Sequence, residues 1–202
     1  MKILTVPHPS LRKESKLITV FDRKIQQVVK DVSKTLAEGP KHAVGLAAPQ
    51  IDSHWRIYAT RQSVIDPTLP QTLVSIFINP RITKTSKKHD FGEDADGTPL
   101  EGCLSIPGIY GPVPRFAWVE VEFERPAILG DKIDDSSDKN AVLVSDSVRL
   151  EGFPARLAQH EIDHLNGILF TDYTLQYDLP LYEENSRKKL IEIEDIRFVE
   201  SY

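Results

Sequence analysis

Residues 159–167 read Gln-His-Glu-Ile-Asp-His-Leu-Asn-Gly and contain the pattern H-E-x-x-H. Two histidines four residues apart lie on one face of an α-helix, with Cβ atoms about 5 to 6 Å apart, so both imidazoles can reach one metal ion. The flanking residues agree with a helix, since Gly152 and Pro154 are typical of its first turn and Asn166-Gly167 of its end. The sequence therefore predicts a helix that can bind a metal ion through these two histidines.

Glu161 lies beside the two candidate ligands, His160 and His164, without being a necessary ligand itself. This arrangement is typical of metal-dependent hydrolases, in which the carboxylate takes a proton from a water molecule that the metal activates. A pattern with three fixed positions can also be a chance match on a core helix. Two ligands do not complete a metal site, so a third ligand must come from elsewhere in the chain.

The third ligand is sought among the remaining His, Cys and acidic residues. No further His follows the pattern, and Glu183 and Glu184 lie in a polar tail. The remaining soft ligand is Cys103, in EGCLSIPG at 101–108, where Gly102 allows the backbone to come close. A lone cysteine can simply be a small buried hydrophobic residue. As a thiolate, however, it would complete a site of one cysteine and two histidines, whose open coordination position is typical of catalysis.

Periodicity predicts the other elements. Residues 22–38 form an amphipathic helix, with Asp22 as its N-cap and Gly39-Pro40 as its stop. The tail from 180 to 202 has few helix breakers, so it is predicted to be a helix with a solvated charged face, a docking surface being the alternative. Alternating and β-branched runs predict strands that pair antiparallel, at 55–60, 73–80, 117–125 and 141–150.

Two polar segments rich in turn-forming residues, 83–99 and 134–140, are predicted to be exposed loops. Glu93, Asp94 and Asp96 in the first segment raise the alternative of a calcium loop. Their spacing lacks the complete set of calcium ligands, so we expect a solvated loop instead.

Composition narrows the class of protein. A chain of 202 residues with 40% hydrophobic and 27% charged residues is expected to fold as one globular domain over 1–202. The net charge of −5 and the pI of about 5.7 do not support general nucleic-acid binding, so no DNA partner is expected. The N-terminal apolar run is too short for a signal peptide, and no run is long enough to span a membrane. A lone cysteine also suits a reducing compartment, so we expect a cytoplasmic protein with no membrane partner.

Three segments together resemble the motifs of peptide deformylases: AVGLAAPQ at 43–50, EGCLSIPG at 101–108 and QHEIDHLNG at 159–167. They occur in that family's order and at compatible separations, and VPHPSLR at 6–12 is similar to its N-terminal segment. Three independent motifs are far more specific than H-E-x-x-H alone. AVGLAAPQ contains neither G-x-G-x-x-G nor G-K-S/T, so a phosphate-binding loop is excluded.

The resemblance implies an α+β fold, in which antiparallel β-sheets pack around a central helix carrying HEIDH, with an N-terminal and a C-terminal helix. It implies a metal-dependent hydrolase that removes the formyl group from the formyl-methionine of newly made polypeptides and releases formate. Cys103, His160 and His164 would hold the metal, and Glu161 would be the base. The other implied site residues are Gln50 and the N–H of Leu104, facing the formyl oxygen, and the substrate-binding residues Val44, Gly45 and Gly102.

Two further positions follow from the resemblance. Arg115 would pair with Glu101 and steady the cysteine loop, the alternative being two unrelated surface charges. The family usually has Gly where this chain has Ala43. That change is mild if the backbone there has an ordinary φ and costly if φ is positive.

The metal and the partners are implied as well. A thiolate with two imidazoles suits Zn2+ and Fe2+ almost equally, and the resemblance favours Fe2+, with Ni2+ or Co2+ as further possibilities. The expected partners are the formylated N-termini of nascent polypeptides and the ribosome near its exit tunnel. Two alternatives stay open. One is an H-E-x-x-H endopeptidase, against which Cys103 argues, and the other is a metal-stabilised relative without activity, against which Glu161 and Gln50 argue.

Overall fold

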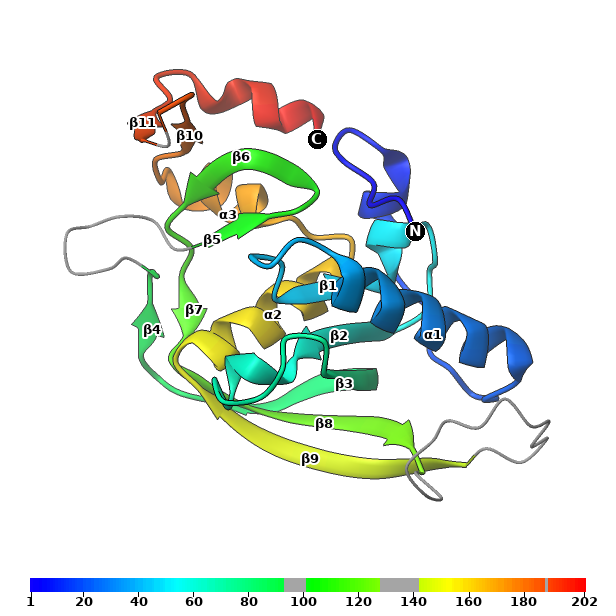
Figure 1. Ribbon diagram of the computed structural model, residues 1–202. Helices are drawn as coiled ribbons and strands as arrows, with labels where there is room; N and C mark the ends of the chain where they lie inside the picture. Colours follow the sequence, from blue (N-terminus) through cyan, green and yellow to red (C-terminus); the bar gives the residue numbers. More distant parts are fainter. Residues whose placement is uncertain (93–100, 128–141, 188) are drawn as a thin grey trace.

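The computed structural model describes residues 1–92, 101–127, 142–187 and 189–202. Within them, antiparallel strands form three sheets, and the helices α1, α2 and α3 pack against these sheets (Figure 1). Helix α2 lies in the middle of the molecule, between the largest sheet and the strands β5 and β6 (Figure 1). The α+β class expected from the sequence is confirmed.

The helices are α1 (Arg23–Glu38), α2 (Phe153–Leu165) and α3 (Phe170–Tyr177), with the short 3-10 turns η1 (Pro9–Arg12), η2 (Ala48–Ile51), η3 (Gln62–Val64) and η4 (Ile196–Ser201). The largest sheet has the order β1 (Gly45–Ala47), β2 (Ile57–Arg61), β3 (Val74–Thr85), β8 (Trp118–Pro126) and β9 (Leu143–Glu151). A second sheet has the order β11 (Leu190–Glu192), β10 (Tyr182–Glu184), β6 (Ile106–Gly111) and β5 (Glu101–Cys103). The third sheet pairs β4 (His89–Asp90) with β7 (Arg115–Phe116).

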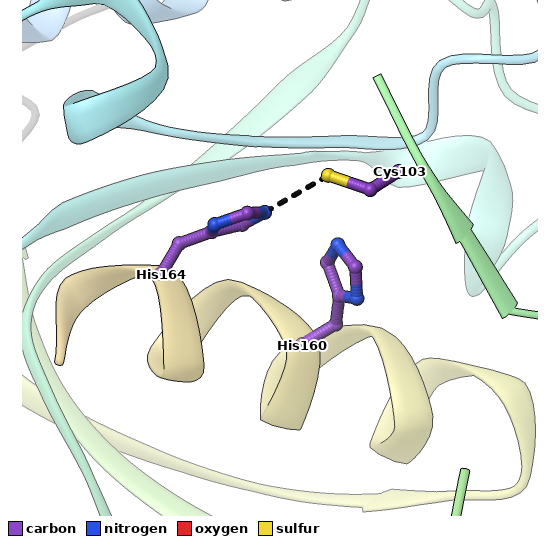
Figure 2. Close-up of side chains that lie close together, drawn as sticks. All are labelled: Cys103, His160 and His164. Atoms are coloured by element: carbon purple, nitrogen blue, oxygen red, sulfur yellow. Dashed lines mark hydrogen bonds between the residues drawn. The ribbon is translucent and has the colours of Figure 1, made fainter. Parts of the chain in front are cut away.

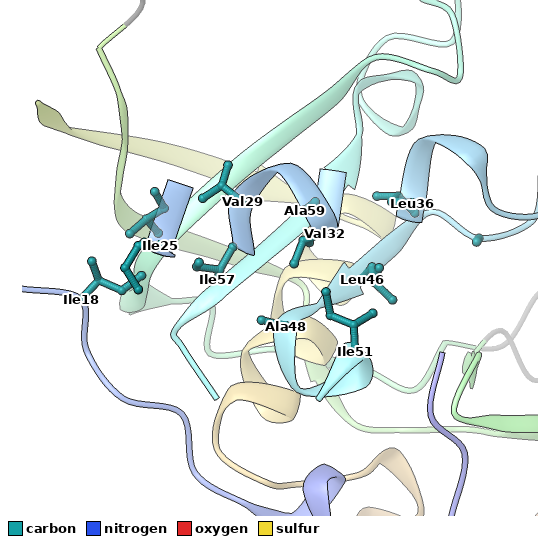
Figure 3. Packing of buried hydrophobic residues seen from close by; sticks show 12 residues of the cluster. Ile18, Ile25, Val29, Val32, Leu36, Leu46, Ala48, Ile51, Ile57 and Ala59 are labelled. Atoms are coloured by element: carbon teal, nitrogen blue, oxygen red, sulfur yellow. The ribbon is translucent and has the colours of Figure 1, made fainter. Parts of the chain in front are cut away.

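Helix α1 covers one face of the largest sheet. Asp22 caps it by accepting a hydrogen bond from the N–H of Ile25 at 2.9 Å, and the helix ends before Gly39, as predicted. Burial of its apolar stripe holds β1, part of the first motif, against the helix. The packed residues are Ile25, Val29, Val32 and Leu36 of α1 with Leu46, Ile57 and Ala59 of the strands (Figure 3). Ile78 of β3 belongs to the same cluster.

Helix α2 packs on the opposite face of the same sheet. Strand β2 is buried on both faces, because Ile57 and Ala59 face the cluster around α1 while Tyr58 packs in the cluster around α2. Val119 and Val121 of β8 belong to this second cluster, which agrees with their alternation with glutamates. The predicted helix is therefore central, and every residue from Ala155 to Leu165 is buried.

The tail does not form the helix predicted over 180–202. In the described residues it contains the hairpin β10–β11, followed by the turn η4. Strand β10 pairs with the edge of β6, where Tyr182 lies opposite Tyr110, and Leu181 and Val199 are buried. Pairing with an available strand edge and burial of these two side chains outweigh the local helical preference of the tail.

The last helix, α3, lies just before the tail and has no counterpart among the predicted elements. It is only eight residues long, and Leu169 and Phe170 anchor it in a third buried cluster that includes Leu181. A segment of that length is too short for a 3.6-residue periodicity to stand out in the sequence.

The segment 83–99, predicted as an exposed loop, is partly sheet. Strand β3 continues to Thr85 because it pairs with β8 that far, and β4 pairs with β7, so the prediction is wrong for these residues. The acidic residues 93, 94 and 96, considered as a calcium loop, lie outside the described residues, as does the whole of 134–140. Among the helices of the described ranges, none is long and apolar enough to cross a membrane.

The turn that ends α2 requires glycine at position 167. Gly167 has φ +71°, and a Cβ there would lie 2.8 Å from the carbonyl carbon of Arg12. Gly108 has a similar φ of +80°, but a Cβ there would meet nothing within 4 Å. We therefore expect Gly167→Ala to lower the free energy of unfolding by more than Gly108→Ala, for which backbone strain alone costs about 1 to 2 kcal/mol. Urea unfolding compares the two variants, and equal losses would exclude a steric contribution from Arg12.

Candidate metal centre

Cys103, His160 and His164 converge between β5 and α2 (Figure 2). Their ligand atoms all lie within 4.8 Å of one another, and Cys103 Sγ is 3.2 Å from His164 Nε2. Both histidines are buried and the cysteine is partly buried. Within the described residues this is the one group of His, Cys, Asp or Glu side chains that could hold a metal ion. The third ligand expected from the sequence thus lies next to the H-E-x-x-H pair.

The donor set suits a divalent metal ion. Two atoms bound to the same tetrahedral ion lie roughly 3.5 Å apart, which is compatible with the separations in this group. A buried carboxylate oxygen beside the group, Glu161 Oε2, has no hydrogen-bond partner in the described part of the chain. Buried polar atoms are rarely left without a partner, so this oxygen indicates a site built around a bound group.

Cys103 lies at the end of β5, where a tight turn leads into β6. Ser105 donates its backbone N–H to Cys103 Sγ at 3.4 Å. Burial by itself would raise the pKa of the thiol, but the neighbouring imidazoles of His164 and His160 outweigh it, so the pKa lies well below its ordinary value. The thiolate, which is the form that binds metals, is therefore favoured.

His160 is oriented by Glu101. His160 Nδ1 lies 2.9 Å from Glu101 Oε1, and Arg115 donates to the same carboxylate through Nη2 at 2.5 Å and Nε at 3.2 Å. Burial would raise the pKa of Glu101, but Arg115 and His160 lower it below its ordinary value, so the carboxylate is ionised. An ionised carboxylate only accepts hydrogen bonds, so His160 donates through Nδ1, which leaves Nε2 as the ring nitrogen that can bind a metal. The expected Glu101–Arg115 pair is present as a buried ion pair.

Glu161 is buried beside the three candidate ligands, and burial raises the pKa of its carboxyl group to about 7. A carboxyl group that titrates near neutral pH is well suited to taking up and releasing a proton. Gly45 of β1 leaves space for this side chain. A Cβ at position 45 would lie 2.8 Å from Leu157 Cδ1 and 2.9 Å from Glu161 Cδ, and closer still to Glu161 Oε1. The close approach of β1 to α2 therefore depends on glycine at this position.

Gln50 reaches the site from η2. Its side-chain Oε1 accepts a hydrogen bond from the N–H of Ala47 at 2.8 Å, and its Nε2 lies 3.1 Å from Ser105 Oγ and 3.7 Å from Cys103 Sγ. The carboxamide is buried, and its NH2 group faces the thiol of the metal centre. The first and second motifs are thus joined directly at the site.

The other residues expected at the site lie in the backbone segments next to it. Leu104 follows the ligand cysteine in the turn after β5 and is half-buried. Val44 immediately precedes β1, and Gly102 lies in β5 against the ring of Tyr110, where a Cβ would be 2.7 Å from Tyr110 Cδ1. Together with Gly45, these residues bring the backbone of both motifs close to the metal centre.

The structure also shows the surroundings of three further positions discussed from the sequence. Ala43 has no positive φ and packs in the core beside α1, so the departure from the family pattern is of the mild kind. Its carbonyl accepts a hydrogen bond from Arg61 Nε at 2.6 Å. Glu183 and Glu184, considered as metal ligands, are exposed on β10 and do not belong to the group of converging ligand atoms.

Several polar residues at the site were not predicted from the sequence. Arg156 and Asp163 lie four residues before and three after His160, a spacing that puts them on its side of α2. Charged residues are rarely buried without a partner. Charges at this spacing on a helix predicted to be buried were therefore the sequence signal that these side chains have charged partners at the site. The contacts are Arg156 with Glu101, Asp163 with Arg115, and Ser105 with Gln50 and Cys103.

Comparison with known proteins identifies the family. The family described as polypeptide deformylase matches residues 1–178. A peptide deformylase of Hahella chejuensis is 35% identical over 176 residues, which cover 86% of this chain and 86% of that protein. One of Desulfotalea psychrophila is 31% identical over 188 residues, covering 93% of this chain and 95% of that protein. The crystal structure of a peptide deformylase from Legionella pneumophila is 31% identical, with a TM-score of 0.63, and the match covers 85% of this chain and 84% of that one.

The family match contains all three motif segments and therefore the whole metal centre. Peptide deformylases are metal-dependent hydrolases that remove the formyl group from newly made polypeptides. A centre that combines a thiolate, two imidazoles and a buried carboxylate agrees with that chemistry. The chain belongs to the polypeptide deformylase family.

Proposed function

We propose that this chain deformylates the N-terminal formyl-methionine of newly made polypeptides with a metal held by Cys103, His160 and His164, and with Glu161 as general base. The observation that carries this assignment is the buried Glu161 carboxylate, one oxygen of which has no partner among the described residues, beside three converging ligand atoms. Three protein ligands leave one coordination position open, which is the difference between a catalytic and a structural site.

The side chains divide the reaction between them. When bound, a divalent metal ion supplies Lewis-acid polarisation of the formyl oxygen and of a water molecule. Glu161 takes a proton from the attacking water and later passes it to the departing amine. The NH2 group of Gln50 and the backbone N–H of Leu104 donate hydrogen bonds to the formyl oxygen as negative charge develops on it. The bond between the formyl carbon and the nitrogen breaks, releasing formate and a free amino terminus.

The proposed metal is Fe2+. One thiolate and two imidazoles suit Fe2+ and Zn2+ almost equally, so the preference rests on the family, with Ni2+ and Co2+ as alternatives. The iron form should be sensitive to oxygen, because oxidation of Cys103 would remove a ligand.

Formate release tests the proposed function. A protein prepared without oxygen is analysed for its metal content and assayed with a formyl-Met peptide, the same peptide without the formyl group being the control. We expect formate release that stops when a chelator removes the metal and returns when Fe2+ is added. A metal-loaded protein that released no formate would overturn the proposal and leave a metal-stabilised relative without activity. Cleavage of casein without formate release would favour the H-E-x-x-H endopeptidase.

The cellular setting is part of the same proposal. Nascent chains carry the formyl group when they leave the ribosome, so we propose that the chain acts in the cytoplasm near the exit tunnel. Co-sedimentation with ribosomes that carry formylated nascent chains tests this setting, and ribosomes without nascent chains serve as the control.

Gly45→Ala is expected to lower kcat by about 100-fold and to leave the metal content unchanged, because the added methyl group would displace the Glu161 carboxylate. Steady-state kinetics and metal analysis measure both quantities. Gly39→Ala is the matched control, since its Cβ would be crowded at 2.9 Å by the Thr35 carbonyl, away from Glu161. A wild-type kcat in Gly45→Ala would show that this contact does not constrain the base.

A further inference from the structure

Arg156 is a second buried cation at the metal centre, in addition to Arg115. It lies one helical turn before His160 on α2, and its side chain is only 6% exposed. Burying a guanidinium is costly unless its donors are matched by acceptors, so the contacts of this side chain indicate its role.

The Arg156 guanidinium joins segments that are far apart in the sequence. Its Nη1 donates to Glu101 Oε2 at 2.7 Å and to the Val113 carbonyl at 2.9 Å, and its Nη2 donates to the Asp90 carbonyl at 2.6 Å. Gly92 has φ +70° and lies against the guanidinium, where a Cβ would be 2.7 Å from Arg156 Nε. Both branches of the planar fork are therefore engaged, an arrangement that a lysine ammonium cannot reproduce.

Glu101 connects Arg156 to a metal ligand. Its Oε1 faces His160 Nδ1, and its Oε2 faces Arg156 Nη1, while Arg115 donates to both oxygens. Because both oxygens accept hydrogen bonds, the orientation of the carboxylate plane is fixed. Oε1 cannot rotate away from His160 without breaking the contact between Oε2 and Arg156.

In the ion-pair network around Glu101, the negative and positive charges are equal in number only when Arg156 is included. Glu101 and Asp163 contribute two negative charges, and Arg115 forms ion pairs with both of them. Arg156 adds the second positive charge, on Glu101. Without it, two buried carboxylates would compete for one guanidinium, and Glu101 Oε2 would keep only the longer contact with Arg115, at 3.2 Å.

We propose that Arg156 is a positioning residue of the metal centre. By binding Glu101 Oε2 it orients Oε1 toward His160 Nδ1, and so holds the His160 imidazole in the orientation that binds the metal. This inference rests on the ligand set of the proposed function and extends it to a residue that is not itself a ligand. Through Asp90 and Gly92, the small sheet β4–β7 is coupled to the same centre.

The rate of metal release tests the role of Arg156. Arg156→Lys and Arg156→Gln are compared with the wild-type full-length chain, each loaded with Zn2+ and mixed with a chelator. We expect both variants to release Zn2+ about tenfold faster. Loss of a direct outer partner of a metal-binding histidine lowers metal affinity by roughly 10- to 100-fold, and Arg156 acts on His160 one step removed, through Glu101. The NMR signal of the His160 Nδ1–H should also shift, and so should the d–d absorption of bound Co2+. A general loss of stability would change neither.

Val32→Ala is the matched control for destabilisation. Val32 is completely buried in the cluster around α1, on the other face of the largest sheet, so its truncation should lower stability without changing Zn2+ release. Wild-type release rates in the Arg156 variants would overturn the inference, and the charge-preserving Lys variant decides alone if the Gln variant does not fold. A wild-type chain that bound no Zn2+ would instead refute the ligand set, so the two failures can be told apart.

Discussion

Glu161→Gln is expected to lower kcat for formate release by about 10²- to 10⁴-fold, the usual contribution of a general base, while the metal stays bound. Glutamine has nearly the same volume, so it fits the space that Gly45 leaves beside α2. It cannot accept the proton that the attacking water must lose. Because the side chain is not one of the three converging ligands, metal content should remain that of the wild type. Steady-state kinetics with a formyl-Met peptide and metal analysis of the same sample measure both effects.

Glu151→Gln is the matched control for this variant. Glu151 ends β9, and its side chain is 66% exposed in a pair with Arg149, so kcat should be that of the wild type. A wild-type kcat in Glu161→Gln would contradict the role of Glu161 as the base. A loss of metal together with activity would show that Glu161 serves the metal site in another way.

Cys103→Ala is expected to abolish tight metal binding. The change removes the thiolate, one of three converging ligand atoms, and leaves the two imidazoles of His160 and His164. The loss of affinity should exceed the roughly 10- to 100-fold that removal of an outer-shell partner costs, because a direct ligand is lost. Equilibrium dialysis against Zn2+ or Fe2+ without oxygen measures the change, and retention of stoichiometric metal would disprove the role of Cys103.

Ile109→Val tests whether the effect belongs to the ligand and not to the hairpin. Ile109 is buried in β6, on the same hairpin as Cys103, and the variant removes one methylene group but no ligand. It should bind metal as the wild type does. The chain has a single cysteine, so a thiol reagent reports on Cys103 alone. Bound metal should protect this thiol in the wild type, and chelation should expose it.

Particular elements show why sequence reasoning succeeded for some parts of the fold. Helix α1 begins after Asp22 and ends before Gly39, and α2 has Pro154 in its first turn and ends before Gly167. The sequence predicted these boundaries correctly because capping and helix-breaking residues act within one helical turn. The alternation in β8 identified its buried face for the same local reason. The tail from 180 to 202 did not follow local preference, because the edge of β6 was available for pairing with β10.

Some residues of the candidate site could likewise be predicted from local sequence, and others could not. The H-E-x-x-H pair required only the geometry of one helix, so the sequence was sufficient to propose it. Arg156 and Asp163 carry no motif, and their importance depends on burial and on a carboxylate that is distant in the sequence. Glu101 lies 55 residues before Arg156, and their contact exists only after β5 has packed beside α2.

By itself, the sequence determined which chemical groups are available and on which local elements they lie: two imidazoles and a carboxylate on one helix, a thiolate in a turn, and a carboxamide after a small-residue segment. These properties depend on neighbours within a few residues. Only the tertiary structure decided that Cys103, 61 residues before His164, lies 3.2 Å from it, and that Arg115 and Arg156 share the carboxylate that orients His160. Such contacts follow from sheet pairing and core packing between distant segments, which no local pattern encodes.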